Sequence, residues 1–265
     1  LRTFKFLTVL TIKVSSLSFF CKINDFNMLI SDFNSREEVL SVAIKELKEI
    51  GIKVRSEKYK QIEVNEKNIK FQCENFNLNF QNKRRRSKKI FKVQLHALEL
   101  DNGILSNGAV CQIPKFVLQA CSRIQNENKT EGLFRKTGNV KKQRQMQEHL
   151  ENGGCFEKQH NVIDIANLLK TFFRELPEPL IPPGSIQDAL IRCLINCTTY
   201  EHKTEAILMT CLFLPPLTVN TLAYFLQFLE VITKNSAENF MTVDNLVKVL
   251  TPSIMPMPLH APEKR

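Results

Sequence analysis

Arg135 is the residue of this chain best suited to act on another molecule. It lies in the stretch EGLFRKTG, residues 131–138, directly after the apolar pair Leu133 and Phe134 and between two glycines. The apolar pair can anchor a bent loop while the guanidinium projects outward. Guanidinium is always charged, and its planar fork of donors suits phosphate oxygens. Arg135 is therefore a candidate phosphate ligand; the alternative is a surface salt bridge, which is the commoner role of an isolated arginine.

Two further cations, Lys170 and Arg174, lie in the segment LLKTFFRELPEPL. They are four residues apart, so on a helix they are neighbours on one face. A helix is predicted here because apolar residues recur at helical spacing, and Pro177 is expected to end it. Taken alone, the two cations are typical of a solvated helix face; together with Arg135 they indicate a site for a phosphate. The apolar stripe consists of Val162, Ile165, Leu168, Leu169, Phe172, Phe173 and Leu176.

These segments resemble the Rho GTPase-activating protein family. The resemblance rests on EGLFRKTGN, DIANLLKTFFRELPEPLIP and the weaker MTVDNLVKVLTPSIM, with LPPLTVNTLAYFLQFLEVI similar to the long core helix of the family. It extends upstream through IFKVQLHAL and IPKFVLQACSRI. A further segment, LSVAIKELKEIGIKV, is similar to the amino-terminal helix of the eleven-A subgroup.

The resemblance implies a protein that accelerates GTP hydrolysis by a Rho-family small GTPase and hydrolyses nothing itself. Arg135 matches the arginine finger of the family, which is inserted in trans beside the γ-phosphate. Lys170 and Arg174 match positions that brace the finger loop and contact the GTPase. Asn245 matches an asparagine that hydrogen-bonds at the GTPase surface, and Lys136 is a peripheral contact. No cofactor is expected, since GTP and Mg²⁺ belong to the partner.

The carboxyl end departs from the family pattern. Ser253 stands where the family usually has asparagine, and it is expected to contact the partner with fewer donors. Residues 256–265 are rich in proline and cannot form the further packed helix that the family normally carries. The chain is therefore expected to lack the final helix or helices, and an alternative function is a Rho-binding module with impaired activation.

The expected fold is an all-α, RhoGAP-like helical bundle. Residues 1–27 are interpreted as an unstructured or non-native leader, because the chain opens with Leu1 and the first methionine is Met28. An amino-terminal helix is predicted in 28–54, a polar linker with a basic run in 55–89, the RhoGAP-like domain in 90–255 and a proline-rich tail in 256–265.

Local signals predict where individual helices begin and end. Ser35 and Glu38 form a capping box, and Gly51 is expected to stop the helix that follows. Ser185 and Thr218 are predicted to cap two further helices.

A dense basic run occupies residues 83–89, and the chain carries a net charge of +10. This run could contact an anionic membrane, act as a nuclear import signal, bind nucleic acid without specificity or remain a solvated linker. No stacking aromatics interleave with the charges, so no specific nucleic-acid binding is expected. The expected location is the cytoplasm, with the nucleus as an alternative through the basic run.

The eight cysteines and five histidines show no metal-ligand spacing. Several cysteines fall on predicted apolar helix faces and are expected to be reduced core thiols. The sequence therefore predicts no metal site, and the protein is expected to be a monomer.

Overall fold

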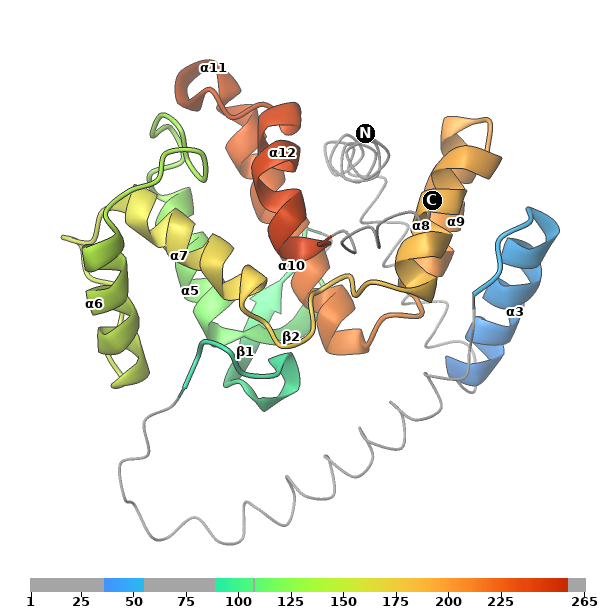
Figure 1. Cartoon of the computed structure of the whole chain (residues 1–265), viewed down its shortest axis with the longest axis horizontal. Helices are drawn as coiled ribbons and strands as arrows, with labels where there is room; N and C mark the ends of the chain where they lie inside the picture. Colours follow the sequence, from blue (N-terminus) through green and yellow to red (C-terminus); the bar gives the residue numbers. More distant parts are fainter. Residues whose placement is uncertain (1–35, 55–88, 107, 257–265) are drawn as a thin grey trace, which may run out of the picture.

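The computed structural model describes residues 36–54, 89–106 and 108–256, and over these residues the chain is mostly helical, as predicted (Figure 1). In chain order the elements are α3 (Arg36–Glu49), the 3-10 turn η2 (Leu95–Ala97), β1 (Leu100–Ile104), β2 (Val110–Pro114), α5 (Lys115–Gln125), α6 (Val140–Glu151), α7 (Val162–Arg174), α8 (Ser185–Asn196), α9 (Tyr200–Cys211), α10 (Pro216–Lys234), α11 (Ser236–Asn239) and α12 (Val243–Ile254).

Some of the sequence predictions concern other parts of the chain. The leader 1–27, residues 55–88 of the basic linker, residues 257–265 of the tail and the capping residue Ser35 all lie outside the described residues.

The longest described helix, α10, runs through the centre of the molecule (Figure 1). It packs against α5 and β2. Pro216 is its first residue, where the fixed φ of proline suits a helix start and the missing N–H costs no hydrogen bond. Because neighbours surround it, α10 is apolar on more than one face. Its buried residues include Leu222, Ala223, Phe225, Leu226, Phe228, Leu229 and Ile232.

Helix α7 confirms the predicted apolar stripe. Every residue of that stripe is buried, from Val162 to Leu176, and the helix packs against α5, α6 and α12. The side chain of Asn161 caps its first turn by accepting a hydrogen bond from the N–H of Ile163 at 2.8 Å. The helix ends at Arg174, before Pro177 as expected.

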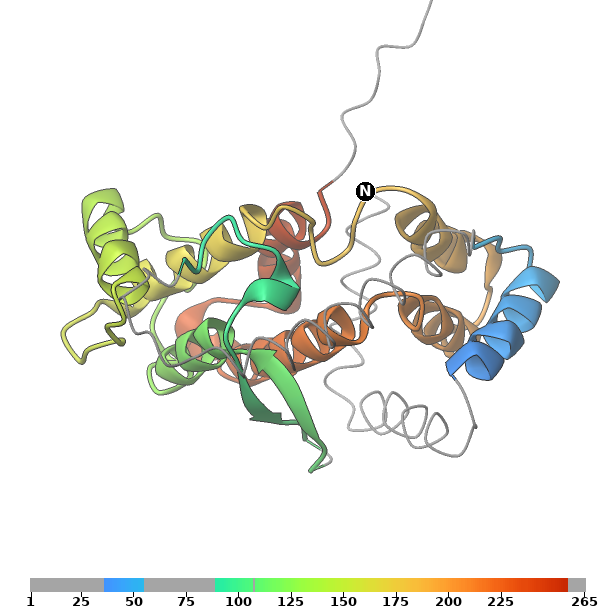
Figure 2. The ribbon, with the colours of Figure 1, turned by 90° about the horizontal axis from the view of Figure 1, so that it is seen from below.

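Helices α3, α8 and α9 pack together at one side of the molecule (Figure 2). Helix α3 ends at Glu49, and Gly51 stops it as predicted: its φ of +76° lets the N–H of Ile52 return to the carbonyl of Leu47 at 2.8 Å. The side-chain amide of Asn196 on α8 stabilises this turn by donating a hydrogen bond to the carbonyl of Ile50.

A two-stranded antiparallel sheet accompanies the helices, and the sequence did not predict these two strands. β1 pairs with β2 from Leu100 opposite Pro114 to Ile104 opposite Val110. The hairpin is closed by the N–H of Leu105 donating to Ala109 at 2.9 Å. Each strand has only five residues, too few for alternation to be distinguished from the helical periods around it.

Two predicted helix starts are also wrong by one to three residues. Ser185 lies inside α8, and the cap position belongs to Gly184, whose φ is +122°. Thr218 lies in the first turn of α10 and is buried, with Pro215 at the cap. Glycine and proline have no polar side-chain atom and so form no capping hydrogen bond; they shape these starts through their backbone dihedrals.

Candidate functional site

Arg135 lies on an exposed turn between α5 and α6, anchored as predicted by the apolar pair before it. Leu133 and Phe134 are fully buried, whereas the side chain of Arg135 is 46% exposed. The ring of Phe134 packs edge-on against Phe225 and Phe228 of the central helix, with centroids 6.5 and 6.2 Å away. The buried side chain of Phe134 therefore anchors the turn in the core directly before Arg135.

The backbone of this turn is fixed by hydrogen bonds around Gly132. The N–H groups of Arg135 and Lys136 both donate to the carbonyl of Gly132, at 3.0 and 2.9 Å. The N–H of Gly132 donates to the carbonyl of Asn239 at 2.8 Å, which joins the turn to the last residue of α11. Gly132 and Gly138 have positive φ values of 77° and 62°, a conformation that glycine adopts without steric cost.

Lys170 reaches the turn from α7. Its Nζ donates to the carbonyl oxygen of Phe134 at 2.9 Å, and that carbonyl belongs to the peptide unit leading into Arg135. The structure therefore brings Lys170 and Arg135 together, as the sequence predicted.

Two other residues of α7 hold the same segment. The amide of Asn167 donates to the carbonyl of Lys136 at 2.6 Å, and Oδ1 of Asp164 accepts from the N–H of Asn139 at 2.6 Å. Asp164, Asn167 and Lys170 are spaced three residues apart, so they lie along one side of the helix. Three successive side chains thus fix the segment from 134 to 139 on one face of α7.

Of the two cations of α7, Lys170 lies in a partly desolvated environment. Burial lowers the pKa of Lys170, and the positive charge of Arg174 lowers it further. Arg174 is exposed, and its guanidinium donates to Oγ1 of Thr171 on the same helix at 3.3 Å. Such a pair of like charges is unfavourable in the isolated helix and favours an anion beside it.

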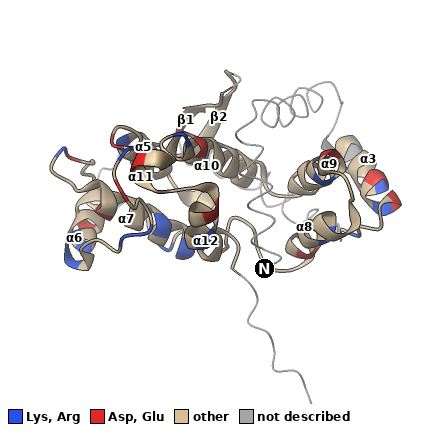
Figure 3. Ribbon diagram, turned by 90° about the horizontal axis from the view of Figure 1, so that it is seen from above, with Lys and Arg blue, Asp and Glu red and all other residues tan. Residues whose placement is uncertain are grey.

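One carboxylate lies beside the turn. Oε1 of Glu131 is 3.9 Å from Nη2 of Arg135 and 3.2 Å from Nζ of Lys136, and all three side chains are about half exposed. Exposed ion pairs of this kind are worth about 0 to 1 kcal/mol, so a stronger anion can replace Glu131. Basic segments also occur along α6 and α12 in the half of the molecule that holds the turn (Figure 3).

Asn245 lies in the first turn of α12 and is partly exposed. One hydrogen of its amide is used internally, because Nδ2 donates to the carbonyl of Phe240 at 2.9 Å. Among the described residues, no donor to its Oδ1 is found.

Ser253 is placed differently from its prediction. It lies near the end of α12 and is only 5% exposed, so the isolated domain does not present its side chain to a partner. A contact with the partner is expected from the sequence because Ser253 stands where the family usually has asparagine. In this chain the smaller hydroxyl fits within the packed side of the helix.

Asn239 is a residue that the sequence reasoning missed. It is fully buried, and its amide donates to the carbonyls of Asn128 and Ile232 at 2.7 and 2.8 Å. Its Oδ1 accepts from the N–H of Met241 at 2.7 Å, and its carbonyl accepts from Gly132. Asn239 therefore connects the loop before Arg135 with the ends of α10 and α11. No local signal marks it, since its partners are remote in sequence.

Within the described ranges, no group of three or more histidine, cysteine or acidic side chains could hold a metal ion. The helices of that part of the chain also include none that is both long and apolar enough to cross a membrane.

Comparisons with known proteins identify the family of this chain. The RhoGAP domain family model matches residues 114–258, which is more than half of the chain. The chain belongs to the RhoGAP family. Among its RhoGAP relatives, human Rho GTPase-activating protein 11A is 36% identical over 168 residues, covering 63% of this chain and 16% of the relative. Mouse Rho GTPase-activating protein 6 is 28% identical over 169 residues, covering 58% and 17%.

A solved structure supports the RhoGAP fold. The crystal structure of human Rho GTPase activating protein 15 superposes with a TM-score of 0.54 at 23% identity, covering 63% of this chain and 78% of that one. The chain spans about a sixth of the length of the two curated relatives named above. Those RhoGAP relatives are named as activators of a GTPase rather than as hydrolases.

Proposed function

We propose that this domain stimulates GTP hydrolysis by a Rho-family small GTPase, with Arg135 inserted in trans beside the γ-phosphate. The observation that carries the proposal is the exposed guanidinium on a turn fastened to the core through Phe134 and to α7 through Lys170. A charge presented on a fixed turn loses little freedom when it meets its target, so more of its interaction energy stabilises the transition state.

Arg135 would stabilise the negative charge that develops on the phosphoryl oxygens during transfer. An arginine supplied in this way typically accelerates hydrolysis ~10³- to 10⁵-fold. GTP and Mg²⁺ are supplied by the partner, so the domain needs no cofactor of its own. Glu131 would leave the guanidinium as the stronger phosphate anion arrives, because its contact at 3.9 Å is long and exposed.

The other cations would act around this contact. Lys170 holds the turn by its bond to the Phe134 carbonyl. Arg174 is exposed on the next turn of α7 and is available for an acidic or phosphate group of the GTPase. Asn245 would accept a hydrogen bond from the GTPase through Oδ1 while its Nδ2 stays on Phe240.

Single-turnover hydrolysis by purified, GTP-loaded Rho and Rac proteins tests this proposal. The chain is expected to accelerate hydrolysis by at least one of them, and Arg135→Ala should remove the acceleration while the variant still binds the GTPase. Arg192→Ala, which alters an exposed arginine on α8, is the matched control and should keep full activity. Unchanged stimulation by Arg135→Ala would refute the role of the finger, and binding without stimulation by the unaltered chain would support the alternative of a binding module.

A further inference from the structure

Phe240 is unusual both in the exposure of its ring and in its backbone conformation. Its side chain is 53% exposed, although a phenylalanine gains most from burial. Its backbone lies in the left-handed region, with φ 56° and ψ 25°, which is strained for a bulky residue. Strained residues of this kind persist only where the surroundings impose them, and they cluster at functional sites.

The surroundings of Phe240 impose its conformation through hydrogen bonds. Its N–H donates to the carbonyl of Ser236 at 3.0 Å, and its own carbonyl accepts from Nδ2 of Asn245 at 2.9 Å. The residue before it, Asn239, is the fully buried one that holds Gly132. The ring of Phe240 is thus presented to solvent from a fixed backbone.

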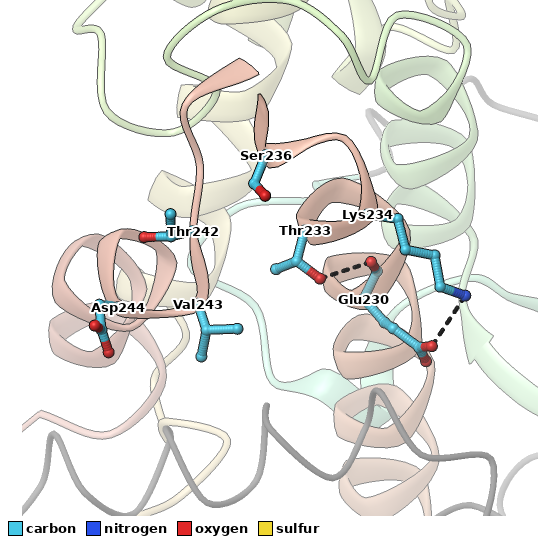
Figure 4. A pocket seen from close by; sticks show the side chains of 7 residues that line it. All are labelled: Glu230, Thr233, Lys234, Ser236, Thr242, Val243 and Asp244. Atoms are coloured by element: carbon cyan, nitrogen blue, oxygen red, sulfur yellow. Dashed lines mark hydrogen bonds and ion pairs between the residues drawn. The ribbon is translucent and has the colours of Figure 1, made fainter. Parts of the chain in front are cut away.

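The ring of Phe240 does not fill the neighbouring cavity. The link of residues 237–241, which carries Phe240, lies beside a cavity of about 480 Å³ between the end of α10 and the start of α12 (Figure 4). Ser236 and Thr242, which flank the link, line this cavity, and Phe240 does not. The charged and hydroxyl groups on the α10 wall are satisfied within that helix: Lys234 pairs with Glu230 at 3.0 Å, and Thr233 donates to the Glu230 carbonyl.

The same link is connected to the turn that carries Arg135. The carbonyl of Asn239 accepts from Gly132, and the carbonyl of Gly132 accepts from the N–H of Arg135. One exposed cation and one exposed aromatic ring therefore project from a single hydrogen-bonded scaffold. Other exposed apolar side chains, such as Ile195 on α8 at 55%, sit in a regular helix and need no such explanation.

We propose that Phe240 is an apolar anchor for the GTPase, seated against an apolar patch beside the nucleotide pocket when Arg135 enters it. This inference rests on the proposed function and adds a residue that sets affinity and orientation. A large aromatic side chain that becomes fully desolvated is the kind of residue that dominates the energy of an interface. Phe240 touches neither the nucleotide nor the transferred phosphate, so it acts on the binding of the GTPase and not on the rate within the complex.

The test compares Phe240→Asn with the unaltered chain. Asparagine accepts the left-handed conformation, so this variant removes the ring and keeps the backbone. In single-turnover hydrolysis by a Rho-family GTPase, the concentration of domain giving half-maximal stimulation should rise about tenfold, while the rate at saturation stays the same. Phe240→Gly, which also tolerates positive φ, should show the same rise, and Ile195→Asn should show none.

A direct measurement of binding to the GTPase distinguishes the role of Phe240 from that of Arg135. With a GTPase carrying a non-hydrolysable GTP analogue, Phe240→Asn should bind about tenfold more weakly than Arg135→Ala. An unchanged half-maximal concentration in both Phe240 variants would overturn the anchor and leave the role of Arg135 intact. A lower rate at saturation with unchanged affinity would also overturn it, because the residue would then act on catalysis. Failure of the unaltered chain to bind any Rho-family GTPase would overturn both proposals.

Discussion

The ammonium of Lys170 donates a hydrogen bond to the backbone carbonyl of Phe134, 2.9 Å away, across 36 residues of sequence. One peptide unit therefore links the core helix α7 to the residue that presents the guanidinium. The bond is charge-assisted and half-buried, which makes it stronger than an exposed ion pair. In the proposed function, Lys170 would therefore act on the position of Arg135 without touching phosphate.

Lys170→Met is expected to lower the stimulation of GTP hydrolysis at saturating domain about 10- to 100-fold, because a displacement of about 1 Å in a catalytic group costs on that order. Methionine keeps much of the buried volume but cannot donate to the Phe134 carbonyl. Lys142→Met, which alters an exposed lysine of α6, is the control. Equal rates for Lys170→Met and the unaltered chain in single-turnover assays would show that the turn holds its position without α7.

Arg174→Gln is expected to weaken stimulation and yet stabilise the fold. The pKa of Lys170 is lowered by burial and then by Arg174, so the charged amine costs folding free energy below that lowered pKa. Removing Arg174 relieves part of the cost, and a like-charge pair at this spacing is worth about 0.2 to 0.5 kcal/mol. Because Arg174 is exposed, the gain should lie at the low end and shrink with added salt.

Urea unfolding at several pH values checks the sign of this effect. The unfolded chain keeps the Lys170 proton up to about pH 10.5. Between the lowered pKa and that value, the contribution of Lys170 to the free energy of unfolding rises with pH. The advantage of Arg174→Gln should therefore be full at pH 7 and fade in alkaline solution, and a variant less stable than the parent at pH 7 would contradict the argument.

Asn239→Ala is expected to lower the free energy of unfolding by about 2 kcal/mol, since it removes the side-chain partners of the Asn128 carbonyl and the Met241 N–H and leaves the Ile232 carbonyl with the N–H of Asn235 alone. Asn239→Asp should also destabilise, because a carboxylate can accept from Met241 but cannot donate. Asn152→Ala, at an exposed helix end, is the matched control and should change stability little. Denaturant titration measures all three, and a neutral Asn239→Ala would mean that water replaces the amide.

Gly138→Ala should destabilise the chain more than Gly153→Ala. Both glycines have positive φ, at 62° and 88°, so both substitutions strain the backbone by on the order of 1 kcal/mol. A methyl group on Gly138 would also collide with the carboxylate of Asp164, whereas one on Gly153 meets nothing within 4 Å. Gly138→Ala should therefore also reduce stimulation, and equal melting temperatures for the two variants would contradict the collision.

The sequence predicted those features of the fold that depend on residues close together in the chain. The stripe of α7 follows from helical spacing, the buried pair Leu133 and Phe134 follows from two apolar residues before a cation, and Gly51 follows from the need for positive φ at a helix end. Arg135 and Lys170 were predicted as partners through the family resemblance, and the 2.9 Å bond to the Phe134 carbonyl gives that pairing its geometry.

The rest depends on contacts that no local pattern encodes. The amide of Asn239 meets a carbonyl 111 residues away in sequence, so its role appears only in three dimensions. Ser253 was assigned to the surface by analogy with a longer side chain, and packing of α12 buries it. The strands β1 and β2 were missed because pairing between them stabilises segments too short to show a period of their own.

Buried cysteines should be alkylated more slowly than exposed ones. Burial raises the pKa of Cys193 and of Cys211 to about 12, so both thiols stay neutral and unreactive in the folded protein at pH 8. Cys155 is exposed and should react first among the described cysteines. Since unfolding exposes the thiols to ionise near pH 9, the contribution of both buried cysteines to stability should fall as pH rises from 9 toward 12. Mass mapping after iodoacetamide treatment checks this order, and labelling of Cys193 as fast as Cys155 in the native protein would show that the α8 and α9 pair opens readily.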